Sequence, residues 1–216
     1  MLEPMMLIQS QKTIRLLVAD DHPIVRQGLV AILNAQPDMH VVAEANNGKD
    51  GIEQFRRHQP DVAILDLQMP EVGGVEAIAT IRAEFPNAAI IMFSIYETDE
   101  DIYQGLRAGA KAYLLKDTPC PEILEVIRAV SEGQRYVPAD IGTKLAARME
   151  RPNLSDREFE VLSLMAKGKN NKAIASDLNI TENTVKFHVT NVMIKLGASD
   201  RTHAVVNGLR QGIIKL

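Results

Sequence analysis

Acidic side chains directly follow two short apolar runs of this chain, and a lysine follows a third. Asp20 and Asp21 come after Ile14–Ala19, Asp66 after Val62–Leu65, and Lys116 after Ala112–Leu115. If these runs are parallel strands, the polar residues that follow them lie together at the carboxyl edge of one sheet. Carboxylates held that close repel one another unless a divalent cation or an ammonium group neutralises them. The spacing therefore predicts a Mg²⁺ site beside an aspartate that can attack a phosphoryl group.

The segments between these runs predict the elements that must position the carboxylates. Strand-like runs at 14–19, 40–44, 61–66, 88–94 and 111–115 alternate with helix-like segments at about 22–36, 48–58, 74–84, 98–108 and 120–132. Five repeats of strand and helix predict an α/β fold, a doubly wound parallel sheet with helices on both faces. In the expected strand order 2-1-3-4-5, the strand that ends at Asp66 lies beside the strand that supplies Asp20 and Asp21.

This order gives each side chain a part in phosphoryl chemistry. A metal ion at the strand ends would be held by carboxylate oxygens, a backbone carbonyl near Gln68 and waters. Asp66 would attack the incoming phosphoryl group to form an acyl phosphate, and Lys116 would pair with that phosphate. Ser94 supplies a hydroxyl from the end of the fourth strand. The alternative for any single aspartate here is a helix N-cap.

The same residues resemble those of a known family. The matching motifs are Asp20-Asp21, Asp66 to Pro70 followed by Gly73-Gly74, Ser94, and Gly109 to Lys116. Over about residues 14–133 they are similar to the receiver domain of bacterial two-component response regulators, a flavodoxin-like fold. The resemblance implies that Asp66 accepts phosphate from a sensor histidine kinase. It further implies that Mg²⁺ is held by Asp20, Asp21, Asp66 and the backbone carbonyl of Gln68.

Two further expectations come from this resemblance. Ser94 and Tyr113 are implied to be the switch pair, in which the hydroxyl moves toward the phosphate and the aromatic ring changes rotamer. Many receivers have a proline directly after the lysine of the site, whereas this chain has Asp117. We therefore predict no cis peptide bond at that position.

A linker and a second domain follow the α/β pattern. Residues 134–153 interrupt it, and the stretch from Ala139 to Met149 predicts a short linker helix before Pro152. Residues 154–216 show only helical segments, at 155–167, 170–177, 181–196 and 201–211. They predict a small all-α domain of four helices. The second and third of these helices, joined by a brief turn, have the spacing of a helix-turn-helix.

The third of these helices has two distinct faces. Its expected buried stripe is formed by Val185, Val189, Val192 and Leu196. The opposite face presents side chains that suit the major groove of DNA. Lys186 and Lys195 suit phosphates or guanine, Asn191 suits adenine or phosphate, and Phe187 suits a thymine methyl group. From charge alone, a solvated helix face is the alternative.

The amino-acid sequence of the last domain resembles that of the LuxR-type DNA-binding domain. It covers about residues 154–216 and includes Leu154 to Leu162, Gly168 to Ala175, Thr184 to Val189, and Lys195 to Gly197. A receiver joined to this domain is similar to the NarL/FixJ class of response regulator. The resemblance implies base-reading positions at Lys186, Phe187 and Thr190. It implies phosphate contacts at Asn171, Lys172, Thr184, Asn191 and Lys195. Some relatives have a lysine at the position of Thr190, so the operator cannot be copied from them.

Composition agrees with two domains that have different partners. Residues 1–133 carry 11 lysines and arginines against 20 acidic residues, whereas residues 154–216 carry 9 against 6. A basic end is compatible with double-stranded DNA. The chain has one cysteine and no apolar run of the ~20 residues that a membrane span needs. We expect a cytoplasmic protein with no membrane partner and no signal peptide.

We therefore expect a transcription regulator, not an enzyme, which forms a homodimer when it is phosphorylated. The sequence contains no ATP-binding glycine loop or kinase histidine motif, so the phosphate must come from outside the chain. One rival is a Mg²⁺-dependent phosphohydrolase, but such enzymes resemble a pattern with a second aspartate where this chain has Gln68. A second rival is a constitutive DNA-binding protein whose first domain only docks other proteins.

Overall fold

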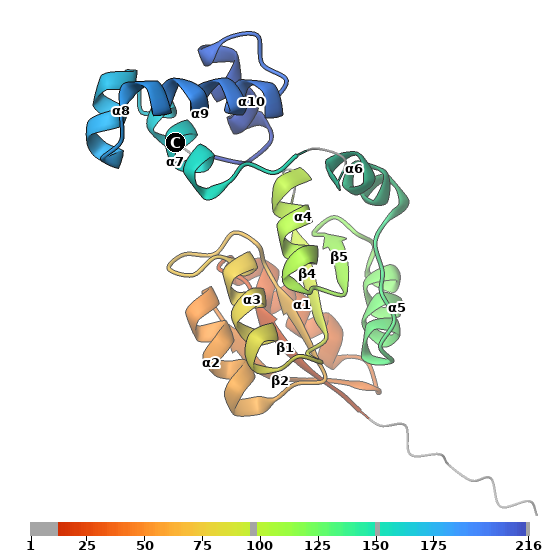
Figure 1. The fold of residues 1–216 in the computed structure, drawn as a ribbon. Coiled ribbons are helices and arrows are strands. Elements are labelled where there is room, and N and C mark those ends of the chain that lie inside the picture. The colour runs from red at the N-terminus through yellow and green to blue at the C-terminus, as the bar shows by residue number, and fades with distance from the viewer. Residues whose placement is uncertain (1–12, 96–98, 150–151, 215–216) are drawn as a thin grey trace, which may run out of the picture. The chain divides into compact units, whose positions relative to one another are not determined.

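The computed structural model describes residues 13–95, 99–149 and 152–214 of the chain. The chain divides into two compact units. The first comprises Met1–Tyr96 and Gln104–Pro138, and the second comprises Glu97–Tyr103 and Ala139–Leu216, each without the residues that are not described. Figure 1 draws the first unit in red to green and the helical part of the second in teal to blue.

The first unit contains a five-stranded parallel sheet in the order β2-β1-β3-β4-β5, as predicted. The strands are β1 (Ile14–Ala19), β2 (Met39–Ala45), β3 (Val62–Leu65), β4 (Ile90–Ser94) and β5 (Ala112–Leu115). The fourth strand begins at Ile90, two residues later than predicted. Residues 86 and 87 form a turn, and the carbonyl of Ala88 that follows it accepts a hydrogen bond from the Arg82 guanidinium at 3.3 Å, so a side chain binds the backbone just before the strand.

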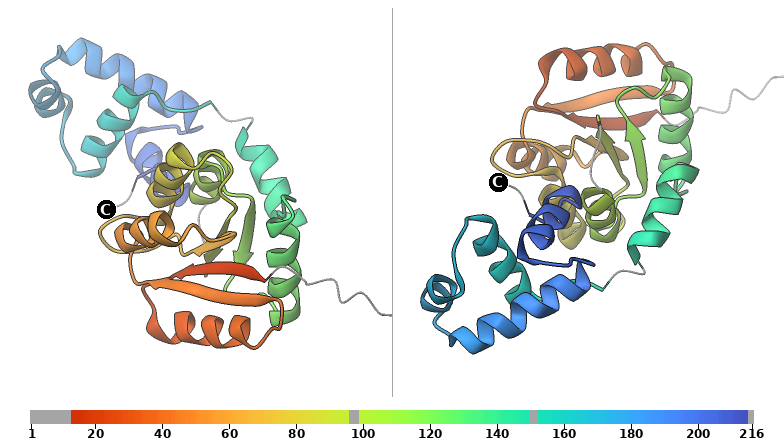
Figure 2. Two further views of the ribbon diagram at one scale, coloured as in Figure 1. Left: turned by 90° about the horizontal axis from the view of Figure 1, so that it is seen from below. Right: turned by 90° about the horizontal axis from the view of Figure 1, so that it is seen from above.

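Helices cover both faces of this sheet (Figures 1 and 2). They are α1 (Pro23–Asn34), α2 (Gly48–His58), α3 (Gly74–Glu84), α4 (Asp99–Ala108) and α5 (Cys120–Ser131). Leu33 of α1 and Ile127 of α5 belong to one buried cluster with Leu16, Ile64 and Ile91 of the sheet. Because strand side chains alternate between faces, the residues between these face the other helices. This confirms the doubly wound architecture, although residue 98 of the fourth predicted helix lies outside the described residues.

The ends of these helices follow from local chemistry. Asn47 caps α2 by accepting the Asp50 N–H at 2.8 Å. Gly109 ends α4 with φ +112°, a conformation that side chains with a Cβ rarely adopt. The described residues contain no cis peptide bond, which agrees with the expectation for Asp117.

The second unit is helical along its described residues from Ala139 onward. Its helices are α6 (Ala139–Met149), α7 (Asp156–Ala166), α8 (Asn171–Leu178), α9 (Glu182–Lys195) and α10 (Arg201–Arg210). Ser155 and Glu158 form the predicted capping box of α7. Leu162 of α7, Ile174 of α8, Val185 and Val192 of α9 and Ala204 of α10 share one buried core. The predicted four-helix domain and its preceding short helix are thus present.

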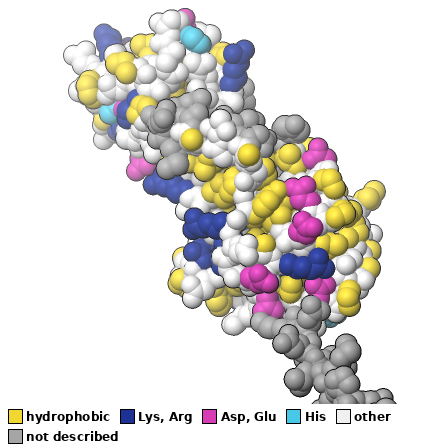
Figure 3. Space-filling view, turned by 90° about the vertical axis from the view of Figure 1, so that its right-hand side faces the viewer, with side chains coloured by type: hydrophobic (Ala, Val, Ile, Leu, Met, Phe, Trp, Pro, Cys, Tyr) yellow, Lys and Arg dark blue, Asp and Glu magenta, His cyan; other side chains and the backbone are white. Residues whose placement is uncertain are grey.

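Surface composition differs between parts of the chain. On the face drawn in Figure 3, the first unit carries several acidic side chains among hydrophobic ones. Within the described ranges, no helix is both long enough and apolar enough to span a bilayer.

Candidate functional sites

The ends of β1, β3, β4 and β5 meet at one edge of the sheet. The parallel register ends β1 and β3 at the paired residues Ala19 and Leu65. Asp66 then donates its N–H to the Ala19 carbonyl at 2.8 Å, and Lys116 donates its N–H to the Ser94 carbonyl at 2.8 Å. Asp66 and Lys116, 50 positions apart in the chain, are thereby fixed beside each other.

Lys116 connects two buried carboxylates. Its Nζ lies 2.7 Å from Asp20 Oδ2 and 2.7 Å from Asp66 Oδ2, and all three side chains are less than one-tenth exposed. Burial raises the pKa of Asp66, and the hydrogen bond and charge of Lys116 offset only part of this effect. Burial alone would lower the pKa of Lys116, but its two carboxylate partners outweigh that effect and raise it. A protonated lysine between two carboxylates suits a site that receives a phosphoryl group, which carries up to two negative charges once it is bound to a carboxylate.

Oxygen donors outnumber this single cation. Candidate ligand atoms of Asp20, Asp21, His22 and Asp66 all lie within 4.8 Å of one another. Asp66 also accepts the Gln68 N–H through Oδ1 at 3.2 Å, so its two oxygens have different partners. Three carboxylates on one edge fit a hard divalent cation such as Mg²⁺.

Sequence reasoning gave no histidine a place in this site, yet His22 is part of the cluster. The imidazole Nδ1 of His22 lies 2.7 Å from Asp21 Oδ1, and the backbone N–H of His22 donates to Asp20 Oδ1 at 2.8 Å. Its position directly after Asp21 was the available signal. His22, and not Asp21, is also the N-cap residue of α1, so the alternative that Asp21 caps this helix is wrong.

Two glycines bring the loop after β3 against its neighbours. A Cβ at Gly74 would lie 2.2 Å from the Asp66 carbonyl oxygen, and one at Gly48 would lie 2.0 Å from the Val72 carbonyl oxygen. Both distances are shorter than any real carbon contact. Glu71 lies between them in a left-handed conformation with φ +66°. Close backbone packing therefore holds the loop that begins at the candidate nucleophile.

Ser94 and Tyr113 lie on the same side of the sheet. Paired residues of neighbouring parallel strands point to one face, and β4 and β5 pair Met92 with Tyr113 and Ser94 with Leu115. A Cβ at Gly105 of α4 would meet Met92 Sδ, which places α4 on this face. Both Ser94 and Tyr113 are buried. The sequence-predicted switch pair thus lies on the α4 side of the sheet.

The second unit contains the predicted helix-turn-helix, α8 and α9. The turn between them includes Asn179 in a left-handed conformation with φ 51°. Thr181 caps α9 by accepting the Thr184 N–H at 3.2 Å. All four residues of the predicted apolar stripe of α9 are buried, at 0–8% exposure. The core side of α9 is therefore the one that the sequence predicted.

The opposite face of α9 is open. Phe187 is 62% exposed, and Lys186 and Thr190 are exposed beside it, whereas Asn191 is half-buried. Thr190 donates its hydroxyl to the Lys186 carbonyl at 3.0 Å, which leaves its methyl group as the part turned outward. A large exposed aromatic ring next to a methyl group is an apolar contact surface, and the neighbouring lysine adds positive charge.

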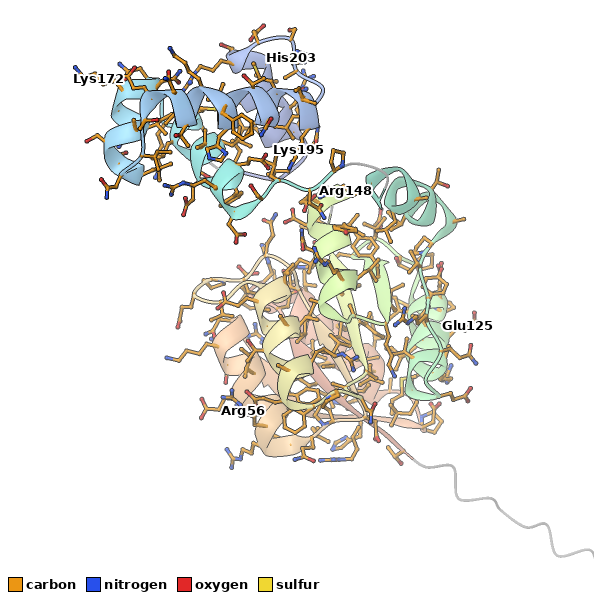
Figure 4. The ribbon with its side chains drawn as sticks, viewed as in Figure 1. Arg56, Glu125, Arg148, Lys172, Lys195 and His203 are labelled. Atoms are coloured by element: carbon orange, nitrogen blue, oxygen red, sulfur yellow. The ribbon has the colours of Figure 1, made fainter. Side chains whose placement is uncertain are left out.

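The predicted phosphate contacts are divided between two places. Lys172 is exposed at the start of α8. Lys195 lies at the far end of α9 (Figure 4), where its ammonium contacts Glu158 at 2.6 Å and the Asn153 carbonyl at 3.0 Å. Thr184 lies near the start of α9 and exchanges a hydroxyl contact of 2.9 Å with Thr181. Lys172 and Thr184 thus lie at helix starts, while Lys195 lies apart with partners inside the domain.

Arg201, the first residue of α10, was missed by sequence reasoning. Its Nη1 donates to Asn171 Oδ1 at 3.0 Å, and its Nη2 donates to the Lys169 carbonyl. Burial lowers the pKa of its guanidinium, which nevertheless remains charged. The partner lies 30 positions away in the chain, and no local pattern predicts such a contact.

Comparison with known proteins identifies two families along the chain. Residues 16–128 match the model of the response regulator receiver domain, and residues 152–207 match that of bacterial regulatory proteins of the luxR family. The uncharacterized transcriptional regulatory protein YxjL of Bacillus subtilis (strain 168) is 39% identical over 95% of this chain and 100% of its own length. The transcriptional regulatory protein LiaR of the same organism is 39% identical over 93% of this chain and 99% of its own.

A solved structure extends this likeness to a DNA complex. The two-component response regulator RcsB, in its complex with DNA, matches with a TM-score of 0.66 and 26% identity, covering 92% of this chain and 99% of that one. The chain therefore belongs to the two-component response regulators of the NarL/FixJ class, and it is a phosphorylation-dependent transcription regulator with a receiver domain and a LuxR-type DNA-binding domain.

Proposed function

We propose that Asp66 accepts a phosphoryl group from a sensor histidine kinase with Mg²⁺, and that this controls dimerisation and DNA binding. One observation carries the proposal: Lys116 Nζ lies 2.7 Å from both Asp20 Oδ2 and Asp66 Oδ2 at the edge where three strands end. A buried ammonium beside a carboxylate favours an anionic product at that carboxylate.

The transfer itself needs little from the protein beyond placement. An oxygen of Asp66 forms the new bond to phosphorus while the bond from phosphorus to the kinase histidine nitrogen breaks. Lys116 pairs with the added phosphate. Ser94, at the end of the neighbouring strand β4, supplies the hydroxyl of the switch, and Tyr113 is its switch partner. The Asp20, Asp21 and Asp66 carboxylates and the Gln68 carbonyl would hold Mg²⁺, which would supply positive charge to neutralise the phosphoryl oxygens.

The output is DNA binding by a domain that we place at residues 154–216, after a receiver at 14–133 and a linker at 134–153. Lys186, Phe187 and Thr190 form the base-reading face of α9, supported by their exposure. Asn171, Lys172, Thr184 and Asn191 are the proposed backbone contacts. Lys195 is the weakest member of the proposed set, because its ammonium contacts Glu158 at 2.6 Å.

The test combines mass spectrometry with sedimentation and DNA binding. The wild-type chain is incubated with acetyl phosphate and Mg²⁺, and we expect the mass of one phosphoryl group to be added at Asp66. We also expect a shift toward dimers and tighter binding to a duplex selected from a random library. The Asp66→Asn variant, which keeps the size of the side chain, should show none of these changes.

Two results would contradict the proposal in different ways. Phosphorylation of the Asp66→Asn variant to the wild-type level would show that the acceptor is another residue. Phosphorylation of Asp66 with unchanged dimerisation and unchanged DNA affinity would favour a constitutive DNA-binding protein whose receiver only docks partners.

A further inference from the structure

A hollow of about 480 Å³ opens on the DNA-binding domain among the starts of three helices. Its lining includes Asn170 and Asn171 from the start of α8, Lys172, Glu182, Lys186 and Arg201. Three of these side chains are cations and one is an acid. The hollow therefore attracts anions, and its size admits a phosphodiester group with its water.

In the described part of the chain, Arg201 is the only one of these three cations whose side chain donates hydrogen bonds to the wall of the hollow. Its guanidinium donates to Asn171 Oδ1 at 3.0 Å and to the Lys169 carbonyl. Between these two contacts lies Asn170, whose side chain caps α8 by accepting the Ala173 N–H at 2.9 Å. Arg201 of α10 thus binds the residue before the Asn170 cap through its carbonyl and the residue after it through its side chain.

The contact also fixes which way the Asn171 amide faces. Arginine has only N–H donors, so the Asn171 atom that it contacts must be the carbonyl oxygen. The two N–H groups of the same amide then point away from Arg201, and Asn171 is itself part of the lining of the hollow. These groups are donors, as an anion requires, and Lys172 is the next residue along the chain.

We propose that Arg201 is a positioning residue for the DNA backbone, which holds the Asn171 amide so that its N–H groups bind a phosphate in the hollow beside Lys172. This inference rests on the proposed function, because the anion is a phosphate of bound DNA. Arg201 acts through Asn171 and the Lys169 carbonyl, and loss of its charge is not the main effect of its removal.

A random-sequence DNA duplex with a fluorescent label is the probe, because backbone contacts do not depend on sequence. The full chain is compared with Arg201→Gln, Asn171→Ala and the double variant by anisotropy over a range of salt concentrations. We expect each single variant to weaken binding by about ten- to a hundredfold, the loss of one hydrogen bond to a charged group. The double variant should bind no more weakly than the weaker single variant, because the two residues act as one unit.

Two further variants separate position from charge and from folding. Arg210→Gln removes a cation from the exposed last residue of the same helix and should leave binding near the wild-type value. Arg201→Lys keeps the charge but loses the planar fork, so it should bind as weakly as Arg201→Gln. Far-UV circular dichroism identifies any variant that fails to fold. Asn171→Ala leaves the bond from Arg201 to the Lys169 carbonyl in place, and it tests the phosphate contact even if Arg201→Gln unfolds.

The outcomes are distinct from those of the proposed function. Independent losses that multiply in the double variant, together with a salt slope lower by about one for Arg201→Gln alone, would mean a direct phosphate contact by Arg201 and overturn the positioning role. Wild-type affinity of Asn171→Ala would also overturn it. All chains are incubated with acetyl phosphate and Mg²⁺ before the titration. If the phosphorylated wild-type chain binds no duplex at all, the proposed function fails, whichever variant is tested.

Discussion

Lys116 is the residue on which the charge balance of the phosphoryl site depends. Its removal leaves the buried Asp20 and Asp66 carboxylates without their shared cation at 2.7 Å. We expect Lys116→Met to lower the free energy of unfolding by about 3 kcal/mol without Mg²⁺, since breaking a buried ion pair leaves charge uncompensated. Mg²⁺ should restore more stability in this variant than in the wild type, because the cation replaces the missing ammonium.

Urea unfolding followed by circular dichroism, with and without Mg²⁺, measures both effects. Arg57→Met, which removes an exposed cation of α2, is the control and should change little. A Lys116→Met variant whose stability does not respond to Mg²⁺ would show that the carboxylates do not form the cation site.

The exposed ring of Phe187 leads to a prediction about which base the DNA-binding domain recognises. Its ring is 62% exposed on the proposed reading face, and an exposed aromatic ring suits the methyl group of thymine. We expect replacement of a contacted thymine by uracil in a selected operator to weaken binding about fourfold, the effect of one methyl group. In Phe187→Ala the two operators should bind alike. If the wild type binds both operators equally, the Phe187 ring does not contact that thymine methyl group.

The sequence predicted the grouping of Asp20, Asp66 and Lys116 better than the side-chain contacts of the C-terminal domain. Asp20, Asp66 and Lys116 follow strands, and parallel strands end at a common edge, so a local rule is enough to bring them together. Lys195 and Arg201 are held by partners on other helices, at Glu158 and Asn171 respectively. Such contacts depend on how helices pack, which periodicity does not specify.

At the scale of elements, the loop from Asp66 to Gly74 shows how packing sets the phosphoryl site. A Cβ at Gly74 would lie 2.2 Å from the Asp66 carbonyl oxygen and 2.7 Å from Leu67 Cα. We expect Gly74→Ala to destabilise the receiver by about 1–3 kcal/mol and to slow phosphorylation by acetyl phosphate, because the backbone of the nucleophile must shift.

Gly28→Ala is the matched control for this prediction. Gly28 lies within α1, and a Cβ there meets nothing within 4 Å. Alanine in a helix interior should stabilise by up to about 1 kcal/mol and leave the phosphorylation rate unchanged. If Gly74→Ala is phosphorylated at the wild-type rate, the close approach of α3 does not set the position of Asp66.

The ion pair between Glu158 of α7 and Lys195 of α9 leads to a prediction about how stability depends on pH. Burial tends to raise the pKa of Glu158, but the hydrogen bond from Lys195 and those at Ser155 outweigh it, so the pKa lies below its usual value. A lowered folded-state pKa contributes stability above the unfolded pKa, near 4.5, and this contribution is lost as the pH falls through the folded value. We expect Glu158→Gln to cost about 1–2 kcal/mol at neutral pH and little in strong acid.

Hydrogen exchange of the α9 amides in the full chain measures this difference, because it reports the opening of that helix alone. Glu160→Gln is the control, since that glutamate is exposed on the same helix α7. A destabilisation by Glu158→Gln that persists unchanged at low pH would mean that shape, and not charge, fixes this contact.

Element boundaries were predicted best where a cap residue marks them. Ser155, Thr181 and Gly168 mark the start or end of helices within a residue or two of the prediction, because caps satisfy free backbone groups locally. The start of β4 was predicted less well. There residues 86 and 87 form a turn, and the Arg82 side chain binds the carbonyl of Ala88 just before the strand.

At the scale of the whole molecule, the two ends of the chain differ in charge as their chemistry differs. Residues 1–133, which include the receiver, carry 11 basic and 20 acidic residues, and the last 63 residues carry 9 and 6. An acidic receiver repels the DNA phosphates and gives no general attraction to the complex. Binding strength must therefore come from the small C-terminal domain, and two such domains on one DNA bind more tightly than one.

The last prediction concerns how two phosphorylated chains share an operator. A dimer with two recognition helices fits half-sites about one helical turn (~34–36 Å), or a multiple of it, apart. We expect the phosphorylated protein to bind two in-phase half-sites cooperatively in a mobility-shift assay. An insertion of about five base pairs, half a turn, puts the second half-site on the opposite side of the duplex and should remove this cooperativity. The Asp66→Asn protein should bind both spacings alike and without cooperativity. Cooperative binding that survives the half-turn insertion would mean that the two domains are not held at a fixed distance by the phosphorylated dimer.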